Sequence, residues 1–276
     1  MHKDKIKIAV VQFKIKLYRS LSNIKKAEKF IKHAHKNNVD IIVFPEDFIT
    51  GPILANLQLA DANQKYVKIF SKLALNYNIS IIPGSIIEKT RHGYVNTTYF
   101  IANTGKIKLR YEKIHLWHPE RKHLTPGNKI AIINTQFGKI GLAICWDIAF
   151  PELFRAMAQK GVNIVFIPSF WTKQDGGKSL KYNRNSEEIF VNNVLTARAI
   201  ENNMVIVYSN FADNIKINNY NLTSIGQSQI TMPFYGPIVR LDNNLEKMII
   251  KTVDTSILKI SESVYKLRHD MRTSPY

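Results

Sequence analysis

Three side chains with complementary chemistry each follow a strand-like run of this sequence. Glu46 comes just after the β-branched run 41–44, which is typical of a buried strand. Lys113 follows 106–111, where polar and apolar residues alternate. Cys145, the only cysteine, ends an apolar run just before a helix start. Because ligands of open α/β folds bind at the carboxyl ends of the strands, three neighbouring strands of one sheet would bring these groups together.

These residue types fit the hydrolysis of an amide. A thiolate can attack the amide carbonyl and form a thioester, and backbone amides near a helix N-terminus favour the thiolate form of Cys145. A carboxylate such as Glu46, with a raised pKa, can carry the thiol proton to the departing amine and then activate water. A fixed ammonium such as Lys113 can stabilise the oxyanion of each tetrahedral intermediate. This scheme needs no metal and no cofactor.

Each of the three residues also has a plain structural interpretation when it is taken alone. Cys145 would be an inert buried cysteine, since free cysteine is among the most buried residue types. Glu46 would be an ordinary surface carboxylate and Lys113 one of many lysines. The functional interpretation depends on the three occurring together.

Three short motifs surround these residues. They are FPE at 44–46, YEKIHL at 111–116, and CWD at 145–147 followed by FPE at 150–152. In order and spacing they resemble the glutamate, lysine and cysteine motifs of the nitrilase (carbon–nitrogen hydrolase) superfamily, which uses a Glu-Lys-Cys triad. The resemblance runs over nearly the whole chain.

The resemblance implies an α/β fold built as a four-layer α-β-β-α sandwich, with Glu46, Lys113 and Cys145 as catalytic residues. Many members carry a second glutamate six residues before a Pro-Gly, and Glu120 stands at that interval here. By resemblance Glu120 orients the lysine or the substrate and assists the cysteine; its other interpretation is a solvated loop acid. In relatives a C-terminal tail like 255–276 crosses to a partner subunit, which implies a homodimer or larger homo-oligomer, against the alternative of a frayed terminus.

Aromatic residues cluster near the strand ends that carry the triad. Small-molecule pockets are mostly apolar with a few polar groups, so some of these residues are expected to bind substrate and others to belong to the core. The loop 170–177 contains two glycines and is expected to select the substrate. The predicted substrate-binding residues are Trp117, Trp146, Phe150, Phe170 and Trp171.

Three functions compete. The first is an amidase that releases ammonia or an amine from a small linear amide or N-carbamoyl compound, since the cysteine motif resembles that of N-carbamoyl amidases. The second is a nitrilase acting on a nitrile, but those relatives tend to carry Glu where this chain has Asp147. The third is a catalytically silent scaffold or nucleic-acid-binding protein. Departures from the family pattern at 211–223 and 233–236 put the pocket rim and the subunit contacts in doubt.

Composition and order of elements set broader limits. The chain has 276 residues and 45% hydrophobic content, which suits one large domain over 1–276. Strand-like runs alternate with helical periodicity, including helices predicted over 23–36 and 60–76, and this indicates an α/β fold.

Charge, cysteine usage and hydropathy bear on partners and location. The net charge of +18 invites a nucleic-acid interpretation, but the lysines are scattered and form no basic block with interleaved aromatics, so specific nucleic-acid binding is not favoured. A single cysteine excludes an intramolecular disulfide and agrees with a reducing cytoplasm. No signal peptide is visible, and no apolar run approaches the ~18 residues of a membrane span. The sequence therefore predicts a cytoplasmic protein without a membrane partner.

Overall fold

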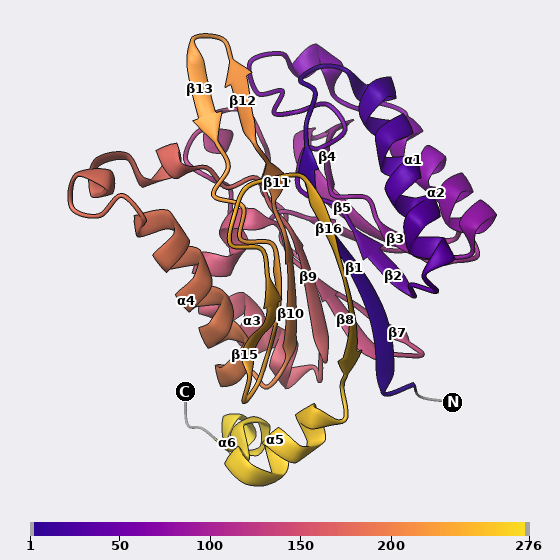
Figure 1. Cartoon of the computed structure of the whole chain (residues 1–276), viewed down its shortest axis with the longest axis vertical. Helices are drawn as coiled ribbons and strands as arrows, with labels where there is room; N and C mark the ends of the chain where they lie inside the picture. Colours follow the sequence, from indigo (N-terminus) through magenta and orange to yellow (C-terminus); the bar gives the residue numbers. More distant parts are fainter. Residues whose placement is uncertain (1–2, 274–276) are drawn as a thin grey trace.

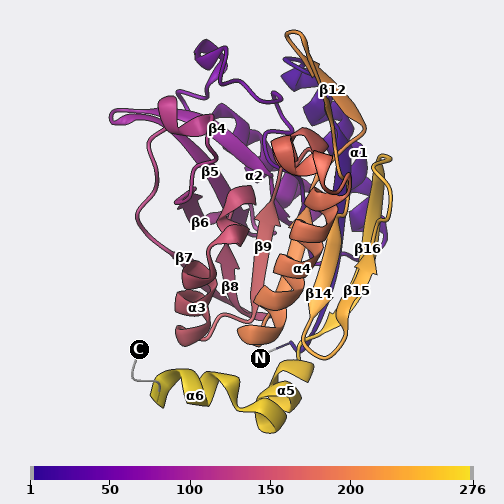
Figure 2. The ribbon, with the colours of Figure 1, turned by 90° about the vertical axis from the view of Figure 1, so that its left-hand side faces the viewer.

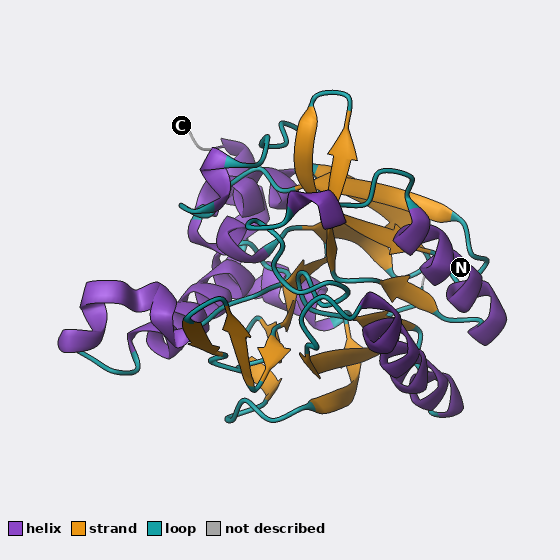
Figure 3. Ribbon diagram, turned by 90° about the horizontal axis from the view of Figure 1, so that it is seen from above, coloured by secondary structure: helices purple, strands orange, loops and turns teal. Residues whose placement is uncertain are grey.

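Two β-sheets face each other in the middle of the protein, and helices cover their outer faces (Figure 1). The computed structural model describes residues 3–273. Seen from above, the strands lie in the middle and helices flank them on both sides (Figure 3). This arrangement confirms the predicted four-layer α-β-β-α sandwich.

The first sheet has eight strands, six of which come from the N-terminal half of the chain. Its strand β1 pairs in parallel with β2, where Ile8 lies opposite Ile41, and antiparallel with the late strand β16. The order β11-β1-β2-β3-β5-β4 is completed by β16 beside β1 and β6 beside β5. The strands are β1 (Lys5–Lys14), β2 (Ile41–Val43), β3 (Ser80–Ile82), β4 (Ser85–Thr90), β5 (Gly93–Ile101), β6 (Ile107–Glu112), β11 (Phe211–Ala212) and β16 (Lys247–Asp254).

The second sheet has six strands in the order β15-β14-β10-β9-β8-β7. Its central strands β8, β9 and β10 run parallel, and the outer strands are antiparallel to their neighbours. The strands are β7 (Ala131–Thr135), β8 (Gly138–Leu142), β9 (Ile164–Pro168), β10 (Val205–Ser209), β14 (Gln229–Met232) and β15 (Gly236–Arg240). A separate hairpin of β12 (Asn214–Ile217) and β13 (Tyr220–Thr223) projects at the top of Figure 1.

Helices form the two outer layers. Helices α1 and α2 cover the first sheet, α3 and α4 cover the second, and α5 and α6 lie below the sandwich (Figure 2). Within residues 3–273, none of the helices has the length and apolar character that a membrane span requires. The α-helices are α1 (Ser20–Lys36), α2 (Lys65–Tyr77), α3 (Pro151–Gln159), α4 (Ser186–Glu201), α5 (Ile257–Tyr265) and α6 (Leu267–Thr273). The short 3₁₀ helices are η1 (Leu57–Leu59), η2 (Glu120–Lys122), η3 (Cys145–Ala149) and η4 (Lys173–Lys181).

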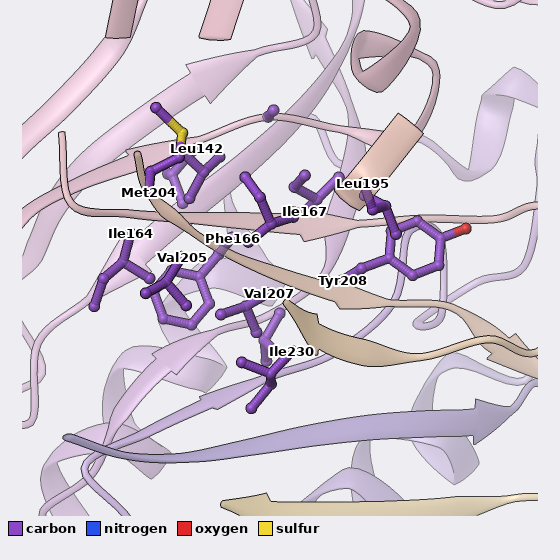
Figure 4. Packing of buried hydrophobic residues seen from close by; sticks show 14 of the residues in the cluster. Leu142, Ile164, Phe166, Ile167, Leu195, Met204, Val205, Val207, Tyr208 and Ile230 are labelled. Carbon is purple, nitrogen blue, oxygen red and sulfur yellow. The ribbon is translucent and has the colours of Figure 1, made fainter. Parts of the chain in front are cut away.

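The central strands are buried on both faces, which explains their nearly continuous apolar sequences. In β1, Ile8 and Val10 pack into the core between the two sheets, while Ala9 and Val11 pack into the core beneath α1 and α2. Figure 4 shows part of the larger core, where residues of β9, β10 and α4 pack together. The predicted C-terminal tail folds as α5 and α6, and its last three residues lie outside the described part.

Candidate active site

Glu46, Lys113 and Cys145 come together at one end of the sandwich, but not from one sheet. Glu46 follows β2 and Lys113 follows β6, which are two strands of the first sheet separated by β3 and β5. Cys145 follows β8 of the second sheet. The condition considered from the sequence, three neighbouring strands of a single sheet, is therefore not met. The groups converge because the two sheets face each other and these strands end at the same end of the sandwich.

Lys113 lies between two carboxylates. Its Nζ is 3.0 Å from Glu46 Oε1 and 2.7 Å from Glu120 Oε2. Asn96, in the middle of β5, donates from Nδ2 to both acids, at 2.8 Å to Glu46 and 3.1 Å to Glu120. The exposed fractions of Glu46, Lys113 and Glu120 are 3%, 1% and 7%. Buried charges are costly unless they are paired and hydrogen-bonded, and this cluster meets that condition.

The electrostatics of the cluster keep Lys113 charged. Burial alone lowers the pKa of Lys113, but the carboxylates of Glu120 and Glu46 outweigh it, so that the pKa is well above its usual value. Burial raises the pKa of Glu46, and Lys113 opposes that shift. The arrangement thus holds a fixed ammonium beside a carboxyl group that accepts a proton more readily than an exposed one.

Cys145 sits at a tight turn and is tied to Glu46 through the backbone of Phe170. The Phe170 N–H donates to Glu46 Oε2 at 2.9 Å, and the Cys145 thiol donates to the Phe170 carbonyl oxygen with an Sγ···O distance of 3.8 Å. Cys145 has a φ of 45°, in the left-handed region that residues other than glycine enter at a cost. The whole residue is 6% exposed.

The expected thiolate is not what the surroundings favour. Burial, together with the charge of Glu46, raises the pKa of the Cys145 thiol well above its usual value, although Lys113 opposes this. Cys145 is the first residue of the short η3, and α3 begins only at Pro151, so the thiol does not lie at the start of the α-helix that the sequence suggested. The resting thiol therefore keeps its proton, and a neighbouring base has to remove it.

Asp147 fastens the turn that carries Cys145. Its carboxylate accepts hydrogen bonds from the Tyr111 hydroxyl at 2.8 Å, the Ile144 N–H at 2.8 Å and the His115 N–H at 3.0 Å. The His115 ring Nδ1 also lies 2.8 Å from it. These contacts connect the lysine motif, which contains Tyr111 and His115, to the cysteine motif. Asp147 itself is fully buried.

Replacing Asp147 with alanine is expected to lower the free energy of unfolding by about 2–5 kcal/mol, because several buried donors lose their acceptor at once. Thermal and urea unfolding of the purified variant measure this loss. The matched control is Asp242→Ala, which removes an exposed carboxylate paired with Arg240 and is expected to change stability by less than about 1 kcal/mol. Equal stabilities of the two variants would contradict the anchoring role.

A cavity of about 270 Å³ opens onto Cys145. Four of the five predicted substrate-binding residues line it, namely Trp117, Trp146, Phe170 and Trp171. The prediction was wrong for Phe150, which is not among the lining residues; its ring stacks on His115 with the centroids 3.7 Å apart. The four charged groups Glu46, Lys113, Glu120 and Asp47 also line the cavity, with Asp175, Ile217 and Leu222 toward its rim.

The rim of the cavity is built from two segments, η4 after β9 and the hairpin β12–β13 after β11. The predicted substrate-selecting loop folds largely as η4, and Thr172 caps its start, because Thr172 Oγ1 accepts the Asp175 N–H at 3.2 Å. Hairpin β12–β13 contributes Ile217 and Leu222. The Thr223 N–H donates to Gln174 Oε1 at 2.9 Å, and this hydrogen bond connects the hairpin to η4.

Several residues of the site were not expected from the sequence. Asn96 bridges the two glutamates from inside a strand, and the only sequence signal was a polar run at 96–98 within an otherwise apolar strand. Asp47 was directly beside Glu46 and could have been found by that position. Ile217 and Leu222 could not, because their approach to the cavity depends on where a hairpin folds.

A thiol, a proton-accepting carboxyl group and a fixed ammonium around one cavity are the parts that covalent acyl-transfer chemistry requires. The chain belongs to the carbon–nitrogen hydrolase family, whose model matches residues 7–259.

Individual relatives agree with this family. The chain is 34% identical over 209 residues to the 2-oxoglutaramate amidase of Bacillus subtilis, covering 74% of this chain and 75% of that protein. It is 29% identical over 272 residues to the probable hydrolase YhcX of Bacillus subtilis, and this match covers 92% of the chain but only 51% of that longer relative. The crystal structure of Saccharomyces cerevisiae Nit3, a member of branch 10 of the nitrilase superfamily, superimposes with a TM-score of 0.84 at 25% identity and covers 95% of each chain.

Proposed function

We propose that the chain hydrolyses the C–N bond of a small linear amide or N-carbamoyl compound through a thioester on Cys145. The observation that carries the proposal is the position of Lys113 Nζ, 3.0 Å from Glu46 Oε1 in the wall of the cavity that Cys145 lines. The amidase name of the Bacillus subtilis relative supports an amide as the substrate class.

Acylation would begin with the protonated thiol. Glu46 takes the thiol proton while Sγ of Cys145 forms a bond to the carbonyl carbon, and the carbonyl oxygen becomes an oxyanion beside Lys113. When the intermediate collapses, the C–N bond breaks and Glu46 gives its proton to the leaving nitrogen. Ammonia or an amine departs, and the acyl group remains on Sγ as a thioester.

Deacylation would use the same groups in reverse order. Water attacks the thioester carbonyl while Glu46 takes one of its protons, and the second oxyanion again forms beside Lys113. Collapse breaks the C–S bond, and the sulfur regains a proton from Glu46. The sum is one amide and one water converted into one acid and one ammonia or amine, with the enzyme unchanged.

The test of this function is ammonia and amine release from a panel of small amides, N-carbamoyl amines, N-carbamoyl amino acids and nitriles. Turnover of amides or N-carbamoyl compounds by the wild type, with none by Cys145→Ala, is the expected result. Turnover of nitriles alone would replace the proposal with the nitrilase alternative. Silence across the panel, with an unreactive Cys145, would favour a non-enzymatic role.

Replacing Lys113 with methionine is expected to lower kcat by about 10²–10³-fold, the usual loss when an oxyanion donor is removed. Methionine keeps most of the side-chain volume, but it leaves Glu46 and Glu120 without their cation. The measurement is steady-state amide hydrolysis by protein whose fold is checked by circular dichroism. Lys122→Met, at an exposed lysine of η2, serves as the control. Turnover near the wild-type rate in Lys113→Met would assign the oxyanion to another group.

The homodimer and the cytoplasmic location stay predictions. Exposed apolar side chains of α5 support a homo-oligomer, because Ile260, Val264 and Tyr265 are each more than half exposed. The Tyr265 ring also lies 5.5 Å from that of Phe234, so this apolar area continues onto the main body.

A further inference from the structure

The cavity is acidic in a protein that is basic overall. The chain carries 39 Lys and Arg against 21 Asp and Glu, with a net charge of +18. The cavity lining contains four acids, and among its described residues Lys113 is the only base. Since a random sample of this chain would be rich in lysine, each of the four acids calls for an explanation. The four acids are Glu46, Asp47, Glu120 and Asp175.

Three of these acids already have partners within the protein. Glu46 and Glu120 hold Lys113 and accept from Asn96. Asp175 accepts the Thr172 N–H at 2.7 Å, which caps the start of η4. Their presence is explained by the triad and by the fold of the rim.

Asp47 is the exception. It is 9% exposed, and its Oδ1 atom is buried without a hydrogen-bond partner among the described residues. Its backbone is held on both sides, because its N–H donates to Ser85 Oγ at 3.4 Å and its carbonyl accepts from the Gly51 N–H at 2.7 Å. A buried polar atom without a partner is rare in folded proteins and costs stability. The carboxyl group is therefore held in place beside the catalytic residues without a partner from the protein.

The electrostatics around Asp47 favour a cationic partner. Burial, with the neighbouring charges of Glu46 and Glu120, raises the pKa of Asp47 well above its usual range. The protonated form of Asp47 is therefore favoured in the free protein, although the charge of Lys113 opposes this shift, and a cation bound beside Asp47 would favour the carboxylate. Three tryptophans of the lining, Trp117, Trp146 and Trp171, present aromatic surface that suits both methylene groups and an ammonium.

We propose that Asp47 binds an ammonium group of the substrate, so that the preferred substrates are amides or N-carbamoyl compounds that also carry a free amino group. This inference rests on the proposed function and names the substrate class of that same site. A substrate with a carboxylate would find no base in the described lining except Lys113, which two glutamates already hold.

The experiment compares pairs of amides that differ by one charge. Each ω-amino amide with two to five methylene groups is paired with the uncharged alkanamide in which a methyl group replaces the ammonium. Succinamate and glutaramate serve as the carboxylate-bearing amides, and N-carbamoyl diamines are paired with N-carbamoyl alkylamines in the same way. The readout is the ratio of kcat/KM for the charged and the uncharged member, so that any general effect on catalysis cancels.

The wild type is expected to prefer the ammonium-bearing member of at least one pair by roughly tenfold or more. In Asp47→Asn that ratio is expected to fall by about 10- to 100-fold, the range for a hydrogen bond to a charged partner. Asparagine keeps the shape and tolerates the left-handed φ of 53° at this position, so the fold is retained. Asp175→Asn is the matched control, and it is expected to change the ratio less, since Asp175 has a structural partner.

The outcomes separate this inference from the proposed function. Preference for the uncharged or carboxylate-bearing amides would overturn the inference and leave the hydrolysis intact. An unchanged ratio in Asp47→Asn, or a larger change in Asp175→Asn, would also overturn it. If no amide is turned over, the proposed function fails, and calorimetric binding of the same pairs to Cys145→Ala, with and without Asp47→Asn, still tests the ammonium site. Equal binding of both members by both proteins would then exclude it.

Discussion

Cys145→Ala is expected to lose amide hydrolysis by about 10⁴-fold or more, because every bond-making step of the proposed reaction uses Sγ. The fold is expected to survive. Removing one sulfur atom from a 6% exposed side chain costs roughly what a buried methylene costs, about 1 kcal/mol, and its hydrogen bond to Phe170 is long, at 3.8 Å. The measurements are ammonia release at saturating amide and thermal unfolding of the same preparation.

The single cysteine of the chain gives this prediction a chemical control. Cys145 is the only thiol that iodoacetamide can alkylate, so loss of activity should follow the incorporation of one label at that residue. Substrate that is present during labelling should slow both the incorporation of the label and the loss of activity. Activity that persists in the alanine variant, or in fully labelled wild type, would contradict the account.

Glu46→Gln is expected to lower kcat by about 10²–10⁴-fold, the usual contribution of a positioned general acid–base. Glutamine has nearly the same shape and can keep the contacts with Phe170 and Lys113, but it cannot take or give the proton. Both halves of the reaction should slow, because each of them needs Glu46 to take a proton and give it back. Amide turnover, measured by ammonia release and by product analysis, reports the loss.

Two comparisons separate proton transfer by Glu46 from a structural role. Glu120→Gln removes the other carboxylate on Lys113 and is expected to cost less; equal losses would contradict the assignment of the proton to Glu46. In the wild type, kcat/KM should fall as the pH decreases through the pKa of Glu46, which burial raises above 4.5, because the protonated acid cannot accept the thiol proton. The residual activity of Glu46→Gln should lack that acidic limb.

The local parts of the site could be predicted from the sequence. Glu46, Lys113 and Cys145 each follow a strand. Those strands could be predicted because the periodicity and apolar content of short runs are visible in the sequence. Four aromatic residues near those strand ends line the cavity, while Phe150, equally near, packs on His115. Which way a ring turns depends on its neighbours in three dimensions, and the sequence pattern does not contain that information.

Non-local contacts account for most of what could not be predicted. The second sheet contributes Cys145 because two sheets pack face to face, and periodicity along one chain does not report which strands pair. Helix α2 begins at Lys65 and not near 60, since the Asp61 carboxylate accepts the N–H groups of Lys65 and Tyr66 at 3.0 and 2.9 Å and caps the helix there. Asn96 likewise acquires its role only when β5 lies beside both glutamates.

Cys145 is expected to carry an acyl group during turnover. Acid-quenching the wild type while it hydrolyses a good amide, and measuring the masses of the intact chain and its peptides, tests this. The expected result is a mass increase equal to the acyl group, located on the peptide that contains Cys145 and absent after hydroxylamine treatment. Steady ammonia release with acyl label on no peptide, or on a peptide without Cys145, would contradict it.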